Sequence, residues 1–245
     1  MKDNFSADAG KYAQFRPDYP DTLVDFILEN VSGHTEAWDC GTGNGQLAKM
    51  LAPHFGTVYA TDISAGQLDN AIPAANIRYL KTPAEHTDFA PQQFDLVTVA
   101  QAVHWFRFDA FYKEVNRTLK DDGLLVITGY SLPEIEPGID TAIRHFHSRI
   151  VGPYWDAERR YVDEHYRTIP FPFKEIQPPA LAKTYQWTLE QLTGYLYTWS
   201  AVKHYLGKEQ KDPVLLIAGM LKDLWGEYET RPVRFPTLVR AGRKL

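Results

Sequence analysis

One short stretch constrains the fold more than any other part of the chain. In Trp38 to Gly45 an apolar run ends in an acid, a glycine-rich turn follows, and a helical pattern begins directly after it. Glycine allows positive φ and lets a ligand lie against the main chain, so a strand, a glycine turn and a helix in this order indicate a ligand site. A tight strand–helix turn that binds nothing is the alternative interpretation.

The spacing of the glycines separates two classes of ligand. A dinucleotide fingerprint requires Gly-x-Gly-x-x-Gly, whereas this turn has Gly41, Gly43 and Gly45, followed by Gln46. Asp39 precedes the first glycine by two residues. Its carboxylate would repel a pyrophosphate but suits a ligand that carries an ammonium group. The pattern therefore favours S-adenosylmethionine over a nicotinamide cofactor.

Composition narrows the class of protein. The chain of 245 residues is compatible with one large α/β domain. Its net charge of −5 argues against a general nucleic-acid binder, and its single cysteine, Cys40, fits a reducing compartment. No apolar run approaches the ~18 residues that a membrane span needs. We expect a cytoplasmic monomer or homodimer without a nucleic-acid or membrane partner.

The order of the predicted elements indicates a parallel sheet. Strands are predicted at 36–40, 57–61, 77–80, 94–99 and 124–128, and helices at 45–53 and 109–120 and from Asp21 and Ser64. This alternation implies βαβ units. A short helix at 7–14 precedes them. Later elements are helices at 138–151, 188–206 and 212–229 and strands at 184–187 and 233–240.

The second half of the chain departs from this regular alternation. Segments 131–181 and 188–230 are predicted to pack over the ligand edge of one domain spanning 1–245, rather than to form an independent domain. Pro236 falls within the last predicted strand and cannot donate a ladder hydrogen bond, so a bulge or break is expected there.

Acids follow two further strands of the predicted sheet. Asp62 ends the second strand, where an acid roughly 20 residues beyond the first strand accepts hydrogen bonds from ribose hydroxyls. An acid that caps a strand or helix is the alternative for Asp62. Glu85 follows the third strand within Thr82 to Glu85, and it either faces an adenine or lies exposed in a loop.

The tip of the fourth strand carries Gln101, His104 and Trp105. Ligands of open α/β sheets lie outside the carboxyl ends of the strands at the switch point, here between the first and fourth strands. These side chains are therefore expected near the reacting end of the ligand. The alternative makes Trp105 a core aromatic and His104 a loop histidine.

Several stretches together resemble a known family. They are Tyr12 to Pro20, Asp39 to Gly43, Asp62 to Ser64, Ala84-Glu85, Phe94 to Val97, Gln101 to Phe106, Arg117 to Lys120 and Tyr197 to Val202. With them the chain resembles a class I S-adenosylmethionine-dependent methyltransferase with a methyltransferase-type-11 domain. More narrowly, it is similar to the trans-aconitate methyltransferase-like group.

The resemblance implies a Rossmann-like α/β fold with a seven-stranded sheet whose last strand is antiparallel. It implies that Gly41 and Gly43 underlie the methionine part of the cofactor. Asp62 would bind the ribose, Ile63 would pack on the adenine, and Arg16 would meet the cofactor's carboxylate. The full set of predicted cofactor-binding residues is Arg16, Asp39, Gly41, Thr42, Gly43, Asp62, Ile63, Ala84, Glu85 and Gln101.

The methyl acceptor decides whether a general base is needed. A carboxylate, with a pKa near ~4, is ionised at neutral pH and needs orientation only. A hydroxyl needs a base, and His104 is the candidate catalytic residue for that role. The resemblance favours a carboxylate, so the predicted function is O-methylation of a small carboxylic acid. The predicted acceptor-binding residues are Trp105, Tyr130, Trp155 and Trp199.

Other functions stay open from the sequence. They are methylation of a carbon, nitrogen or hydroxyl on another metabolite or lipid, and a non-catalytic module that binds S-adenosylmethionine. Metal chemistry is not expected, because His145 and His147 are two residues apart and point to different faces of a helix.

Overall fold

The structure, a computed structural model, describes residues 15–244. The strands are β1 (Glu36–Cys40), β2 (Thr57–Asp62), β3 (Ile77–Lys81), β4 (Phe94–Ala100), β5 (Leu119–Tyr130), β6 (Lys174–Ile176), β7 (Leu181–Trp187) and β8 (Arg231–Arg243). The helices are α2 (Asp21–Asn30), α3 (Gln46–Leu51), α4 (Ala65–Asp69), α5 (Phe108–Thr118), α6 (Pro137–His145), α7 (Arg160–Asp163), α8 (Leu189–Tyr197), α9 (Ser200–Glu209) and α10 (Leu215–Trp225). The helix predicted at 7–14 lies outside the described residues.

The described strands form one sheet in the order β3-β2-β1-β4-β5-β8-β6, with β7 also paired to β8. The first five strands are parallel, whereas β8 is antiparallel to β5. Strands β6 and β7 occupy one position beside β8, because β6 pairs with its end at 241–243 and β7 with its start at 231–237. The predicted seven-stranded arrangement with an antiparallel last strand is therefore confirmed.

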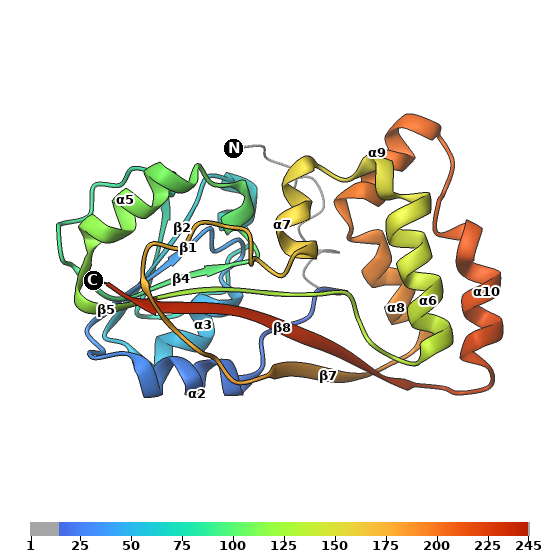
Figure 1. The fold of residues 1–245 in the computed structure, drawn as a ribbon, viewed down its shortest axis with the longest axis horizontal. Helices are drawn as coiled ribbons and strands as arrows, with labels where there is room; N and C mark the ends of the chain where they lie inside the picture. Colours follow the sequence, from blue (N-terminus) through green and yellow to red (C-terminus); the bar gives the residue numbers. More distant parts are fainter. Residues whose placement is uncertain (1–14, 245) are drawn as a thin grey trace.

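Helices cover both faces of the parallel part of the sheet (Figure 1). One face buries the apolar residues of α2 and α3, among them Leu23 and Leu47, and the other buries Phe111 and Val115 of α5. Because both faces are covered, β4 is an almost fully buried apolar strand. The first βαβ units thus form a rigid base that holds the loops at their carboxyl ends.

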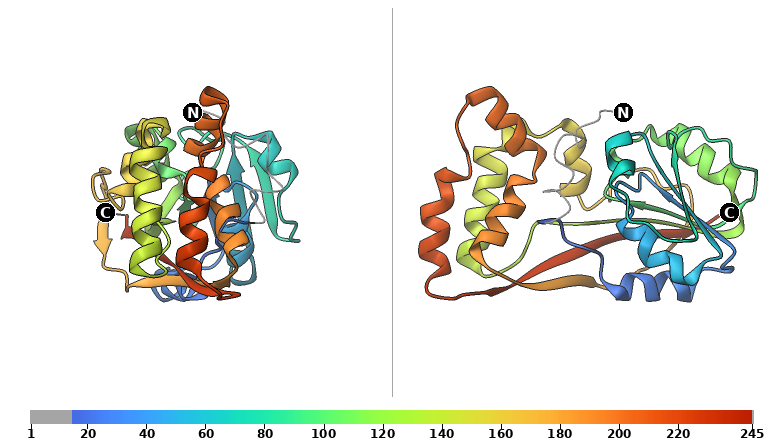
Figure 2. Two further views of the ribbon diagram at one scale, coloured as in Figure 1. Left: turned by 90° about the vertical axis from the view of Figure 1, so that its right-hand side faces the viewer. Right: turned by 180° about the vertical axis from the view of Figure 1, so that it is seen from behind.

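The second half of the chain extends this base in one direction. Strand β8 runs beyond its pairing with β5, and β7 follows it (Figure 1). Helices α6, α8, α9 and α10 stand together at that far end, as both views of Figure 2 show. We call these four helices the helical end.

The helix predicted at 188–206 is wrong as a single element, because it is interrupted between α8 and α9. Thr188 caps α8 as predicted, in a capping box with Gln191. The backbone becomes extended at Trp199, and the Thr198 hydroxyl donates to the Tyr195 carbonyl at 2.6 Å. The interruption lets the Trp199 ring pack against Phe146, while the Thr198 carbonyl is released from the helix.

The break predicted at Pro236 is also wrong. The pairing of β7 with β8 runs without a register shift through Ala182 and Pro236. The Pro236 carbonyl accepts from the Ser131 N–H at 3.1 Å, so the missing N–H would point to that same side, away from β7. The β5–β8 pairing ends at Tyr130 and Thr237, so the missing N–H lies just beyond the last ladder pair.

Candidate active site

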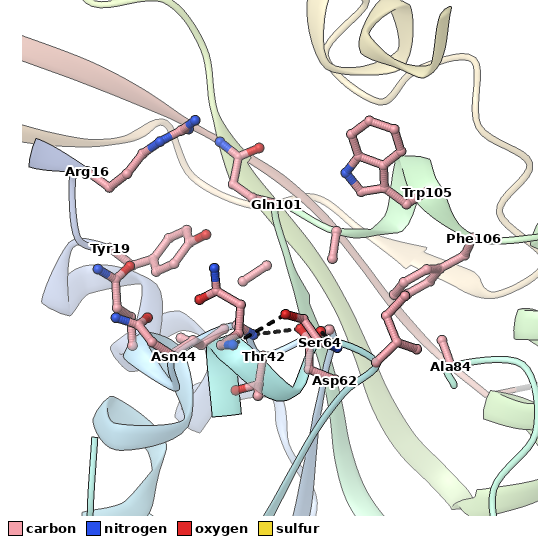
Figure 3. A pocket seen from close by; sticks show the side chains of 18 of the residues that line it. Arg16, Tyr19, Thr42, Asn44, Asp62, Ser64, Ala84, Gln101, Trp105 and Phe106 are labelled. Carbon is pink, nitrogen blue, oxygen red and sulfur yellow. Dashed lines mark hydrogen bonds between the residues drawn. The ribbon is translucent and has the colours of Figure 1, made fainter. Parts of the chain in front are cut away.

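A cavity lies at the carboxyl ends of the five parallel strands. This is the edge at which ligands of open α/β sheets bind. Ten of the predicted site residues line it, namely Arg16, Gly41, Thr42, Gly43, Asp62, Ile63, Ala84, Gln101, Trp105 and Tyr130. Figure 3 shows Asp62 and Arg16 on opposite sides of this space.

The glycine turn after β1 forms the floor of the cavity. Gly41 has φ +68°, and a Cβ there would lie 2.6 Å from the Ala102 Cβ. Gly45 has φ +84°, and a Cβ there would lie 2.1 Å from the Tyr79 hydroxyl oxygen. Any larger residue at these two positions would be strained and would displace a neighbour, so the glycines are required for the close approach of the turn to the loop after β4 and to the Tyr79 side chain of β3.

Asp62 connects this turn to the tip of β2. One carboxylate oxygen accepts from the Gly43 N–H and the other from the Ser64 N–H, each at 2.9 Å (Figure 3). A carboxylate has about four lone-pair positions, so each oxygen retains capacity for a ligand hydroxyl.

Asp39 lies beneath the turn and does not line the cavity. It is fully buried, and it accepts hydrogen bonds from the hydroxyls of Thr42, at 2.5 Å, and Thr98, at 2.8 Å. Burial raises the pKa of Asp39 to about 6, although both hydrogen bonds oppose this shift. Asp39 can therefore act on a ligand only through the turn that it holds.

The opposite side of the cavity carries hydrogen-bond donors. Arg16 donates to the Tyr130 hydroxyl at 2.9 Å and to the released Thr198 carbonyl at 3.2 Å. The Gln101 amide nitrogen donates to the Tyr130 carbonyl at 3.3 Å. In Figure 3 the amide nitrogen of Gln101 points toward Arg16. Trp105 also lines the cavity.

Comparison with known proteins identifies the class of this fold. Residues 38–127 match the family of methyltransferase domains of type 11. A protein of Dictyostelium discoideum named as a methyltransferase is 31% identical over 99% of this chain and 95% of its own length. A solved structure described as a type II methyltransferase from Anaeromyxobacter dehalogenans is 35% identical, with a TM-score of 0.88 over 94% of this chain and 99% of that chain.

The chain belongs to the class I S-adenosylmethionine-dependent methyltransferases. The fold alone is shared with phosphoethanolamine N-methyltransferase 2 of Haemonchus contortus, solved with S-adenosylhomocysteine and phosphomonomethylethanolamine. That structure is 16% identical, with a TM-score of 0.50 over 98% of this chain and 57% of that chain. The predicted enzyme class and cofactor are thus confirmed, while the trans-aconitate methyltransferase-like subgroup stays a prediction.

Several predicted site residues of this methyltransferase do not line the cavity. Asp39 is one of them, and Glu85 is another, since it accepts from the Arg107 N–H at 3.0 Å. Trp155 lines a second cleft between the helical end and β8. Trp199 is only 2% exposed and packs against Trp155.

His104, the predicted catalytic residue, is buried and is also absent from the cavity lining. Its ring stacks on that of Tyr166 at 6.2 Å between centroids, and its Nδ1 has no hydrogen-bond partner among the described residues. Burial lowers the pKa of His104 to about 3, and the positive charges of Arg159 and Arg16 add to the effect. The ring is therefore neutral and weakly basic at neutral pH.

Other residues line the cavity without having been predicted. Tyr19, Asn44, Ser64 and Phe106 are among them. Each of these residues follows a predicted site residue by one to three positions, within or beside the stretches that resemble the family. That proximity could have predicted them as site residues. Within residues 15–244 there is no group of three or more metal-ligating side chains, and no helix is long and apolar enough to cross a membrane.

Proposed function

We propose that this methyltransferase transfers a methyl group from S-adenosylmethionine to a carboxylate oxygen of a small organic acid. When bound, the cofactor supplies an electrophilic methyl group on a sulfonium. The protein must then hold the acceptor in line with that methyl group and exclude water, and such positioning contributes ~7–11 kcal/mol in favourable cases.

The cofactor fits the end of the cavity that contains the glycine turn. The Asp62 oxygens, each with one backbone N–H already bound, have lone pairs for the ribose hydroxyls. At Gly41 the turn lies so close to Ala102 and Phe106 that a Cβ would not fit between them. We assign Ile63 and Ala84 to the adenine and Arg16 to the cofactor's carboxylate. Asp39, Thr42 and Glu85 would support the loops that carry these groups.

One observation carries the choice of acceptor. Among the described residues that line the cavity, Asp62 is the only carboxylate and no histidine is present. Asp62 is engaged by the turn, and His104 is buried with a pKa of about 3. A hydroxyl acceptor needs a base with a pKa near the working pH, whereas a carboxylate is already ionised. The donors of Gln101 and Trp105, both in the cavity lining, suit an anion.

We further propose that segments 131–181 and 188–230 form a cap over the acceptor. Tyr130 and Trp105 would contact the acceptor directly. Trp155 and Trp199 would instead stiffen the apolar wall of this cap, because the Trp199 ring packs on those of Tyr195 and Trp155. A stiff apolar wall would help to exclude water from the transfer.

A methyl-release experiment tests this function. The purified enzyme is incubated with methyl-labelled S-adenosylmethionine and a panel of mono-, di- and tricarboxylic acids, each paired with its primary amide and its alcohol. We expect label to transfer to at least one acid and to be released as methanol by mild alkali, because a methyl ester is hydrolysed and an ether or N-methyl group is not. Transfer to the alcohol or amide members alone would contradict the proposal.

A further inference from the structure

Gln101 has an unusual backbone conformation at the tip of β4. Its φ is +54°, a left-handed value that is costly for a residue other than glycine. Its N–H donates to the Thr128 carbonyl at 2.9 Å, so the strained geometry is held by the neighbouring strand. Strain of this kind persists only where the surrounding structure determines it, and here it aims the side chain across the cavity.

The Gln101 amide lies between two partners that together determine its orientation. The Tyr130 carbonyl can only accept, so the amide nitrogen must face it. The amide oxygen then accepts from the Tyr166 hydroxyl at 3.3 Å. Burial raises the pKa of Tyr166 above its usual value, so this hydroxyl keeps its proton and stays a donor.

Tyr166 reaches this position through a tightly held loop that follows α7. His165 and Tyr166 both have left-handed φ values, +56° and +59°. Arg240 of β8 donates to the carbonyls of Tyr166, at 3.1 Å, and Ile169, at 2.6 Å. A Cβ on Gly129 would lie 2.7 Å from the Tyr166 hydroxyl oxygen and 3.1 Å from the Gln101 amide oxygen. The contact therefore depends on a glycine in β5.

We propose that Tyr166 is a positioning residue that fixes the Gln101 amide with the N–H not bound to the Tyr130 carbonyl toward the acceptor, and that this orientation selects a carboxylate over an amide or alcohol. The inference rests on the proposed function and deepens it. If the amide were free to rotate, its carbonyl oxygen could face the acceptor and repel an anion. Tyr166, by binding the oxygen, removes that alternative together with the Tyr130 carbonyl, which binds one N–H.

The first arm of the test needs no acceptor. In a spectrum of ¹⁵N-labelled protein, the side-chain amide signals of Gln101 are assigned by their loss in Gln101→Glu. Tyr166→Phe should shift these signals and speed their exchange with water. Tyr112→Phe is the matched control, because Tyr112 is buried on the same face of the sheet and its hydroxyl has no hydrogen-bond partner among the described residues. It should leave the signals unchanged.

The second arm uses a carboxylic acid that the panel shows to be methylated. Tyr166→Phe should raise KM for that acid about tenfold, the scale of one hydrogen bond to a charged group. It should leave kcat and the Kd of S-adenosylmethionine within twofold of the wild-type values. Gln101→Glu keeps the size of the side chain but removes the donor, so it should raise KM at least as much.

The outcomes separate the two proposals. If an acid is methylated but Tyr166→Phe behaves like Tyr112→Phe in both arms, the role of Tyr166 is overturned and the proposed function stands. An equal loss of cofactor affinity in Tyr166→Phe, or a smaller effect of Gln101→Glu than of Tyr166→Phe, also overturns that role. If no acid in the panel is methylated, the carboxylate function fails, and selection by Gln101 fails with it.

Discussion

The two ends of the cavity are built in opposite ways. The Asp62 end is assembled from one βαβ unit, in which the carboxylate holds the Gly43 and Ser64 N–H groups, 19 and 2 residues away. The opposite end joins distant segments, since Tyr166 contacts Gln101 across 65 residues and Arg16 contacts Thr198 across 182 residues. The Asp62 end, which we call the local end, therefore depends on local sequence. The opposite end, which we call the distant end, depends on the whole fold.

The largest effect is expected from breaking the local end at Asp62. Asp62→Ala removes two hydrogen bonds to the loops and those proposed to the ribose, each ~1.5–3 kcal/mol for a charged group. We expect the Kd of S-adenosylmethionine to rise about 1000-fold, measured by calorimetry. Asp69→Ala, at an exposed acid of α4, is the control. A rise of less than tenfold in Asp62→Ala would remove Asp62 from the proposed cofactor site.

The local end should also respond to pH through Asp39. Burial raises its pKa from the usual 3.8 to about 6 in the fold, so the folded state retains a proton that the unfolded chain loses. The favourable contribution of this group is full below pH ~4 and is lost as pH rises through about 6, by up to ~3 kcal/mol.

The asparagine of Asp39→Asn cannot ionise. The free energy of unfolding of this variant should therefore rise relative to that of the wild type between pH 4 and pH 7. Urea unfolding at a series of pH values measures this difference, with Asp69→Asn as the exposed control. A difference that stays constant across the range would show that Asp39 is not a buried titrating acid.

A third experiment separates the two ends directly. Arg16→Met should raise the Kd of S-adenosylmethionine about tenfold, because one charged interaction with the cofactor's carboxylate is lost. Adenosine has the ribose and adenine but no carboxylate, so its Kd should not change. Asp62→Ala, by contrast, should raise the Kd of both ligands. If Arg16→Met raises the Kd of adenosine as much as that of S-adenosylmethionine, the assignment of Arg16 to the carboxylate is wrong.

The smallest effect is expected at His104. His104→Ala should lower kcat for a carboxylic acid less than tenfold, because the ring is outside the cavity lining and is weakly basic. Steady-state kinetics measure this, with His147→Ala as a second buried histidine for comparison. A loss of ~100-fold or more at His104 alone, on the scale of general-base removal, would indicate a hydroxyl acceptor.

Much of the local end could be predicted from the sequence. Strand β1 was predicted at about 36–40 and has those bounds, and the first five strands and Ser64 as the cap of α4 also follow from short-range patterns. Those patterns work because turns, caps and alternating βαβ elements depend on neighbours in the chain. The burial of Asp39 beneath the turn was not evident, because the same spacing fits an acid that faces the ligand.

The contacts of the distant end and of the helical end could not be predicted from the sequence, for physical reasons. The interruption between α8 and α9 serves the packing of Trp199 against Phe146 and His147, which follow α6 directly, and no helical periodicity in 188–206 reveals this packing. Pro236 is tolerated because β5 pairing ends beside it, and this depends on the register of three strands. His104 follows β4 as predicted, yet its ring turns toward Tyr166 instead of the cavity.

By itself, the sequence determined the α/β class, the glycine turn, the acid at the end of β2 and the resemblance to methyltransferases, because each depends on residues close together in the chain. Only the tertiary structure decided that Arg16, Gln101 and Tyr130 meet at one end of the cavity and that Tyr166 orients the amide. Those contacts form between segments that are brought together by the packing of β8 and the helical end, and no local pattern encodes which distant side chains will meet.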